Sequence, residues 1–141
     1  MKSILQVLAL IILSVSFLNA NITYFKDARE ISLKKDEQKK ILVKYNGREK
    51  LLTLRWTLYK NGGLVLFRSY DTIVAQNILY LRHKNKSFRL KLKSSSSAAY
   101  YNVPYLLVSF KKFDEKTSKV TLELLLSDAN GNIQLEYLKN D

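Results

Sequence analysis

The feature that most constrains this chain is a period-two alternation of apolar and polar residues, interrupted by Asn-Gly turns. Alternation with period two places apolar side chains on one face of a strand, whereas a helix would need a period of 3.6. Residues 51–60 show the pattern most clearly, with four residues predicted on the inner face: Leu52, Leu54, Trp56 and Leu58. The pattern therefore predicts strands throughout the residues after the first twenty, and no segment there needs an amphipathic helix.

Three hairpins are predicted from this pattern. The first turns at Asn61-Gly62, a pair that tolerates the positive φ angles of a two-residue turn, and places Arg55 opposite Arg68 on its outer face. The second joins 72–81 to 87–93 through a turn over 83–86, with a basic and aromatic outer side. The third turns at Asn130-Gly131 and pairs 120–126 with the segment that follows it.

Further strands are predicted at 22–25, 30–33, 40–45 and 104–113. About eight to ten strands in a chain of this length cannot bury their inner faces as one open sheet. The fold class predicted is therefore all-β, a two-sheet antiparallel β-sandwich. The spacing of Trp56 after Ile41 and Val43 favours an immunoglobulin-like arrangement, in which aliphatic residues take the place of the usual disulfide.

The first twenty residues have the layout of a cleavable signal peptide. Lys2 precedes an apolar run over 4–18, and the small residue Ala20 suits a signal peptidase. An uncleaved anchor is the alternative, but it needs about 18 consecutive apolar residues. We expect a signal peptide over 1–20, a single domain over 21–141 and no transmembrane helix after cleavage. The absence of cysteine favours a bacterial periplasmic or secreted protein over a disulfide-stabilised one.

Positive charge is concentrated in the middle of the chain. The formal net charge is +12, and residues 72–113 contain Lys and Arg but neither Asp nor Glu. Alternation predicts a basic, tyrosine-bearing sheet face over 53–70 and 78–93, composed of Arg55, Tyr59, Arg68, Tyr70, Tyr80, Arg82, Lys84, Lys86, Arg89, Lys91 and Lys93. Such a face attracts anions, although a solvated surface whose guanidinium groups stack on tyrosine explains the same pattern.

Catalytic and metal-binding patterns are weak in this sequence. His83 is the only histidine and no cysteine is present, so a zinc site or a nucleophile-and-base pair lacks its usual residues. The segment 126–133 only partly resembles a calcium loop, because no glutamate closes it. The acids in predicted turns are Asp36, Glu37, Asp114, Glu115 and Asp128. We expect no enzyme activity, no metal and no small-molecule cofactor.

These observations lead to a functional hypothesis of an exported, non-catalytic binding or assembly-support protein. Its basic face is expected to contact an anionic envelope component, which includes the membrane surface, or an acidic protein partner. Nucleic acid is the weakest anionic candidate, because an exported protein seldom meets it. One alternative is a chaperone-like module that pairs through an edge strand. A second alternative is a small hydrolase that uses the turn carboxylates.

Overall fold

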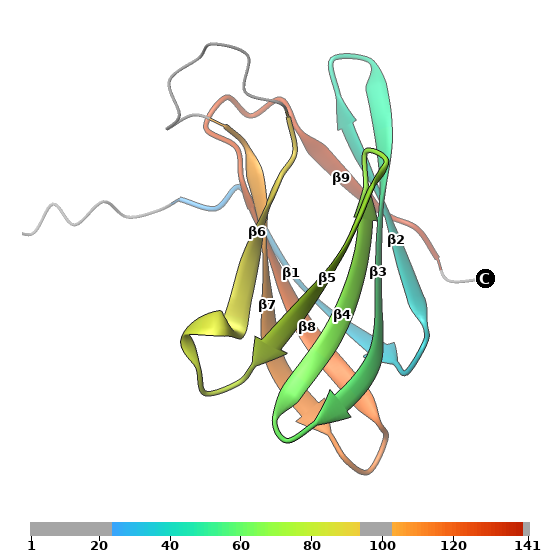
Figure 1. Ribbon diagram of the computed structural model, residues 1–141. Helices are drawn as coiled ribbons and strands as arrows, with labels where there is room; N and C mark the ends of the chain where they lie inside the picture. Colours follow the sequence, from blue (N-terminus) through green and yellow to red (C-terminus); the bar gives the residue numbers. More distant parts are fainter. Residues whose placement is uncertain (1–23, 94–102, 140–141) are drawn as a thin grey trace, which may run out of the picture.

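The computed structural model describes residues 24–93 and 103–139, which form two antiparallel sheets packed face to face (Figure 1). The four-stranded sheet has the order β1 (Asp27–Lys34), β8 (Lys119–Ser127), β7 (Tyr105–Asp114) and β6 (Ser87–Lys91). The five-stranded sheet has the order β5 (Ile73–Tyr80), β4 (Gly63–Tyr70), β3 (Arg48–Lys60), β2 (Gln38–Tyr45) and β9 (Gln134–Tyr137). The predicted all-β, two-sheet sandwich is confirmed, while the predicted signal peptide over 1–20 lies outside the described residues.

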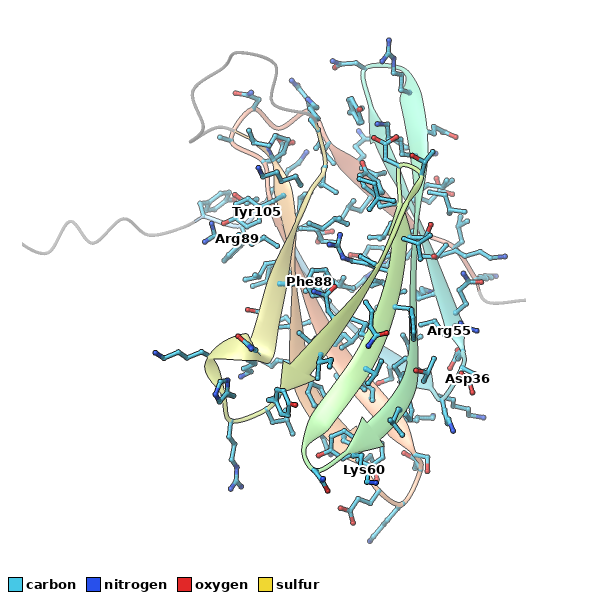
Figure 2. The ribbon with its side chains drawn as sticks, viewed as in Figure 1. Asp36, Arg55, Lys60, Phe88, Arg89 and Tyr105 are labelled. Atoms are coloured by element: carbon cyan, nitrogen blue, oxygen red, sulfur yellow. The ribbon has the colours of Figure 1, made fainter. Side chains whose placement is uncertain are left out.

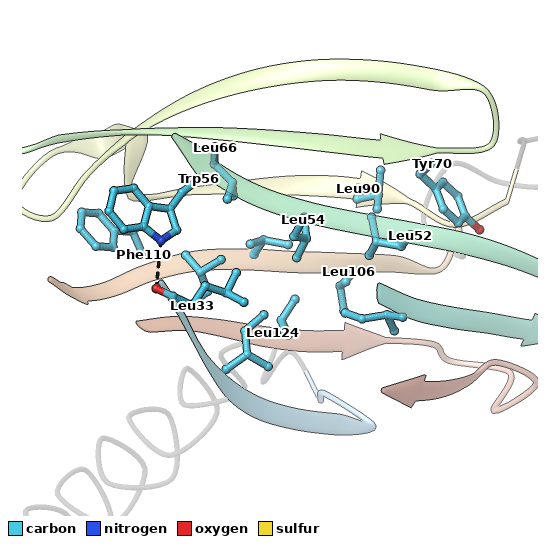
Figure 3. Packing of buried hydrophobic residues seen from close by; sticks show 14 of the residues in the cluster. Leu33, Leu52, Leu54, Trp56, Leu66, Tyr70, Leu90, Leu106, Phe110 and Leu124 are labelled. Atoms are coloured by element: carbon cyan, nitrogen blue, oxygen red, sulfur yellow. Dashed lines mark hydrogen bonds between the residues drawn. The ribbon is translucent and has the colours of Figure 1, made fainter. Parts of the chain in front are cut away.

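One apolar core fills the space between the two sheets (Figure 3). Alternate residues of each strand point into it, as in β8, where the buried positions are Val120, Leu122, Leu124 and Leu126. Trp56 crosses the core, and its indole Nε1 donates a hydrogen bond of 2.9 Å to the carbonyl oxygen of Leu33 in the opposite sheet. Burial of these side chains supplies the main stabilisation of a domain that has no disulfide.

A β-bulge in β3 corrects the predicted face of the first hairpin. The pairing of β3 with β4 shifts between Trp56 and Leu58, so that Thr57 is the extra residue. Beyond the bulge the alternation is inverted: Leu58, predicted to be buried, is 50% exposed, and Tyr59, predicted on the outer face, packs against the core. Next to the turn β4 keeps the predicted pairing, with Leu58 opposite Val65. Leu64 and Leu66 are nevertheless buried, whereas that pairing predicts Val65 and Phe67 on the inner face.

A second bulge lies in β7, where the pairing with β8 shifts between Phe110 and Lys112. The bulges of β3 and β7 bring aromatic side chains together across the sandwich. The ring of Tyr59 lies 4.1 Å from that of Phe113 and 5.9 Å from that of Phe110. These contacts give Tyr59 an apolar environment and explain why it packs against the core instead of lying on the outer face beside Arg55.

The second and third predicted hairpins are wrong. Strands β5 and β6 belong to different sheets, and their connection passes through the short 3₁₀ helix η1 (Lys84–Lys86). Strands β8 and β9 also belong to different sheets, and β9 pairs with β2. In the connection between β8 and β9, the buried residues Asp128 and Ile133 lie where the chain crosses from one sheet to the other. The chain crosses there although Asn130-Gly131 is a good local hairpin signal.

The immunoglobulin-like arrangement stays a prediction. Its sequence argument requires Ile41 and Val43 to face Trp56 across the sandwich. In the structure, the strand β2 that carries them pairs directly with β3, and Ile41 lies opposite Leu52. Trp56 meets the other sheet at Leu33 and at Phe113, whose ring lies 6.0 Å away.

The hairpin of β4 and β5 was not predicted from the sequence. Its turn consists of Asp71 and Thr72, with φ angles of 50° and 67°, and it closes on the pair Tyr70 and Ile73. Positive φ at both central residues defines a type I′ turn, which favours Asn or Asp followed by Gly. Thr72 therefore holds a conformation that a β-branched residue adopts at a cost.

Replacement of Thr72 by glycine is expected to stabilise the protein by about 0.5–1 kcal/mol, because relief of left-handed strain exceeds the added entropy of the unfolded chain. Chemical denaturation followed by circular dichroism measures this change. Replacement of Thr72 by alanine is the control, since alanine keeps the left-handed penalty. Equal stability of the two variants would contradict the strain argument.

Candidate functional site

The structure divides the predicted basic face between the two sheets. Arg55 lies on the outer face of the five-stranded sheet, opposite Phe67 instead of Arg68. Arg89 and Lys91 lie in β6, at the edge of the four-stranded sheet. Figure 2 shows Arg55 and Arg89 on opposite sides of the molecule. The eleven predicted residues therefore do not form one continuous surface.

Two tyrosines of the predicted face belong to the core. Tyr59 packs between Phe110 and Phe113. Tyr70 is buried, and its hydroxyl donates a hydrogen bond of 2.8 Å to the carbonyl oxygen of Leu92 in the opposite sheet. Burial is the main cause that raises the pKa of Tyr70. Both rings therefore pack against the core that joins the sheets and do not lie on an outer sheet face beside Arg55.

Tyr80 and the basic residues that follow it lie at the connection between β5 and β6. Arg82, Lys84 and Lys86 are exposed around η1. The ring of Tyr80 covers Gly63 so closely that a Cβ at that position would lie 2.8 Å from Tyr80 Cε1. Tyr80 also packs edge-on against His83, with 6.0 Å between ring centroids. This region is a charged outer turn, separate from the groove described next.

A groove of about 550 Å³ lies between the edge of the five-stranded sheet and the edge of the four-stranded sheet. Strands β5 and β6 diverge from the connection through η1 (Figure 1). The groove is lined by residues at the turn between β4 and β5 and by residues of β6 and the segment that follows it. Apolar side chains, including Leu90 and Leu92, form part of its wall. Its lining residues are Arg68, Tyr70, Asp71, Ile73, Arg89, Leu90, Lys91, Leu92 and Lys93.

Four cationic residues from the two sheets converge on this groove: Arg68, Arg89, Lys91 and Lys93. Among the described lining residues the single carboxylate belongs to Asp71, and it forms an ion pair with Lys50. The groove therefore carries a net positive charge next to apolar side chains. This combination suits a ligand that has both carboxylate or phosphate groups and apolar groups.

Arg68 is the most informative residue of the groove. It lies opposite Leu54 and Ala75, so its side chain starts on the inner face of the sheet and is half-buried. Its guanidinium lies 5.1 Å from the ring of Phe88, and its Nε donates a hydrogen bond of 3.0 Å to Asn77 Oδ1. Desolvation lowers the pKa of Arg68, but an arginine remains charged at neutral pH.

No carboxylate pairs with Arg68 among the residues that the structure describes. A charge that is partly withdrawn from water and lacks a counter-ion costs free energy. An anion bound in the groove would recover part of that cost and would receive hydrogen bonds from a planar guanidinium. These features make Arg68 a candidate for contact with an anion.

Aromatic rings hold two further cations at the groove. Arg89 lies 4.8 Å above the ring of Tyr105, and Lys93 lies 4.9 Å from the ring of Tyr45. Cation–π contacts restrict the side chains without neutralising their charge. Part of the entropic cost of ordering these groups around an anion is thereby met before binding.

Three of the five carboxylates considered for a hydrolase have structural partners, each in a separate turn. Glu37 accepts a hydrogen bond of 2.7 Å from the backbone of Lys34. Hydrogen bonds from Thr117 are the main cause that lowers the pKa of Asp114. Asp128 accepts a hydrogen bond of 2.7 Å from the backbone of Ile133. Within the described segments, no group of three or more His, Cys, Asp or Glu side chains is placed to hold a metal ion.

Sequence reasoning found the cations of the groove but missed its construction. Asn77, Phe88 and Asp71 were not candidates, and the groove exists because β5 and β6 belong to different sheets. One sequence signal could have indicated that Arg68 faces inward. Leu64, Leu66 and Arg68 are two residues apart, which places all three on the same face of a strand. In the part of the chain that the structure covers, no helix has the length and apolar character needed to cross a membrane.

No family model matches this sequence, and neither the curated proteins nor the solved structures include a match to it.

Proposed function

We propose that this chain is an exported, non-catalytic binding module that takes up an acidic segment of a protein partner in the groove between β5 and β6. The observation that carries the proposal is the half-buried guanidinium of Arg68, which has no carboxylate partner in the described residues. Arg89, Lys91 and Lys93 add positive charge to the same groove. Export is proposed from the signal-like residues 1–20.

The shape of the groove favours an acidic protein segment over a flat anionic surface such as a membrane. A membrane is met by cations on a protruding or planar surface, where several side chains reach the headgroups together. Here Arg68 starts from the inner face of a sheet and is reached through a concave groove next to Leu90 and Leu92. An extended chain with carboxylate and apolar side chains matches both parts of that lining.

Replacement of Arg68 by glutamine tests this function. The probe is a short, end-blocked, fluorescein-labelled peptide of alternating glutamate and valine, and fluorescence polarisation measures its dissociation constant. We expect the variant to bind about tenfold to a hundredfold more weakly, because a charge-assisted hydrogen bond contributes about 1.5–3 kcal/mol. Binding to the unmodified protein should weaken as salt concentration rises.

The matched control replaces Arg55 by glutamine, which removes the same charge from the outer face of the five-stranded sheet. We expect its affinity to stay within about twofold of the unmodified protein, because exposed charges at a distance are screened. Replacement of Lys93 by glutamine is a second groove variant, in case the first one alters the fold. An equal loss of peptide affinity in Arg55→Gln and Arg68→Gln would overturn the proposed function. So would a failure of the unmodified protein to bind the acidic peptide.

A further inference from the structure

Strand β5 is an unprotected sheet edge beside the groove. Within residues 24–93 and 103–139 it pairs only with β4, and its eight residues, IVAQNILY, include no charged side chain. Ile73, Val74 and Ile78 are 64%, 72% and 48% exposed. Natural proteins usually protect a sheet edge with charged residues, prolines, bulges or short strands. An eight-residue apolar edge without these features is a surface on which another strand can pair.

The other sheet edges in the described part of the chain are protected. The edge strand β1 carries four charged residues: Asp27, Arg29, Glu30 and Lys34. The edge strand β6 carries Arg89 and Lys91, and β9 has only four residues, one of them Glu136. Of these edge strands, β5 alone is long and has no charged residue, so we call it the open edge.

The register of β4 and β5 determines which backbone groups face the open edge. A two-residue turn closes on a hydrogen-bonded pair, which here is Tyr70 and Ile73. Alternate residues of β5, beginning with Ile73, therefore direct their N–H and C=O groups towards β4. The residues between them, Val74, Gln76 and Ile78, direct these groups away from the sheet. A strand placed beside β5 would form its ladder with those three residues.

We propose that the acidic segment binds as an added strand that pairs with the open edge of β5. This inference rests on the proposed function and specifies the conformation and side-chain pattern of the partner. In an added strand, alternate side chains point to opposite faces of the sheet. One set would face the groove near Arg68, while the other would lie beside the exposed side chains of Val74 and Ile78.

The small side chain of Ala75 leaves room for this arrangement. Ala75 lies opposite Arg68 in the pairing of β4 with β5, and Arg68 reaches as far as Asn77 along the inner face of β5. The guanidinium is therefore one strand away from the open edge. The preferred segment alternates acidic residues on the groove side with apolar residues on the outer side.

Charge favours an acidic partner over a second copy of this chain. The formal net charge is +12, and the open edge lies beside the groove that contains Arg68, Arg89, Lys91 and Lys93. Two copies paired through β5 would bring two such grooves together with no carboxylate of β5 between them. Like charges oppose that association, whereas glutamate side chains on an added strand would neutralise them.

Replacement of Gln76 by proline tests the strand pairing. Proline removes one outward N–H of the open edge and keeps the hydrogen bonds between β5 and β4, because Gln76 faces away from that ladder. The matched control, replacement of Gln76 by threonine, keeps the N–H. With the glutamate–valine peptide, we expect about tenfold weaker binding for proline and a change within about twofold for threonine.

A second measurement uses the unmodified protein and does not depend on the folding of a variant. Amide hydrogen exchange of Val74, Gln76 and Ile78 is expected to slow on addition of the glutamate–valine peptide, because these N–H groups acquire partners. A peptide of the same composition, with its glutamates and valines in two separate blocks, is expected to bind about tenfold more weakly, because it cannot alternate between the two faces.

The outcomes separate this inference from the function on which it rests. If Gln76→Pro binds like the unmodified protein and the three amides exchange unchanged, strand pairing is wrong, while loss of binding in Arg68→Gln would still support the proposed function. If Arg68→Gln binds normally, the proposed function is wrong. Sedimentation that shows a dimer, dissociated by Gln76→Pro and indifferent to the peptide, would assign the edge to a second copy and overturn the inference.

Discussion

Replacement of Trp56 by alanine is expected to lower the free energy of unfolding by about 3–5 kcal/mol, because it leaves a large cavity in the core. Trp56 is only 3% exposed. It also connects the two sheets, through its hydrogen bond of 2.9 Å to Leu33 and its edge contact with Phe113. A domain of this kind is stable by about 5–15 kcal/mol, so the loss is a large part of the total.

Urea denaturation followed by far-UV circular dichroism is the suitable measurement, because Trp56 is the only tryptophan and its fluorescence is lost in the variant. Replacement of Leu58 by alanine is the control. Alternation alone predicts Leu58 in the core beside Trp56, whereas the bulge leaves it 50% exposed. We expect the control to lose less than about 1 kcal/mol. A loss in Leu58→Ala comparable with that of Trp56→Ala would contradict the bulge.

The bulge of β3 illustrates the limit of prediction from sequence alternation. The residues before it, from Leu52 to Trp56, lie on the faces that alternation predicts. A single extra residue, Thr57, then inverts the faces of Leu58 and Tyr59, and the local sequence has no glycine to indicate it. The aromatic contacts of Tyr59 with Phe110 and Phe113 favour the inverted arrangement. Those partners come from a strand about fifty residues away, which local patterns do not include.

A second limit of prediction from the sequence is that it does not show to which sheet each of two consecutive strands belongs. Local turn signals identify where the chain reverses, and Asn61-Gly62 does join paired strands. A similar signal at Asn130-Gly131 lies in a connection that crosses between the sheets. Both kinds of connection reverse the chain, so the choice depends on which sheet each strand completes. The groove depends on the same choice, because it lies where β5 and β6 separate into different sheets.

The crossing between β8 and β9 is organised around the carboxylate of Asp128. Its side chain is only 2% exposed, and Oδ2 accepts a hydrogen bond of 2.7 Å from the backbone of Ile133. Lys26 Nζ lies 3.8 Å from the same oxygen and donates hydrogen bonds to the carbonyl oxygens of Gly131 and Ile133. The ammonium group thus contacts three oxygens of the segment that resembles part of a calcium loop. This arrangement gives Asp128 a structural role.

Replacement of Asp128 by alanine is expected to lower the free energy of unfolding by about 3 kcal/mol. The substitution leaves the buried amide of Ile133 without its acceptor and removes the carboxylate beside Lys26. Replacement by asparagine is the control, because its amide oxygen keeps the acceptor and loses only the charge. We expect the asparagine variant to lose about 1 kcal/mol.

Urea denaturation measures both losses, and amide exchange at Ile133 reports the local effect. Exchange at Ile133 should accelerate in Asp128→Ala beyond what the change in global stability explains, because the connection between β8 and β9 opens first. Equal losses in the two variants would assign the stabilisation to the charge of Asp128 and its attraction to Lys26. A larger loss in the alanine variant assigns it to the hydrogen bond that turns the chain from one sheet to the other.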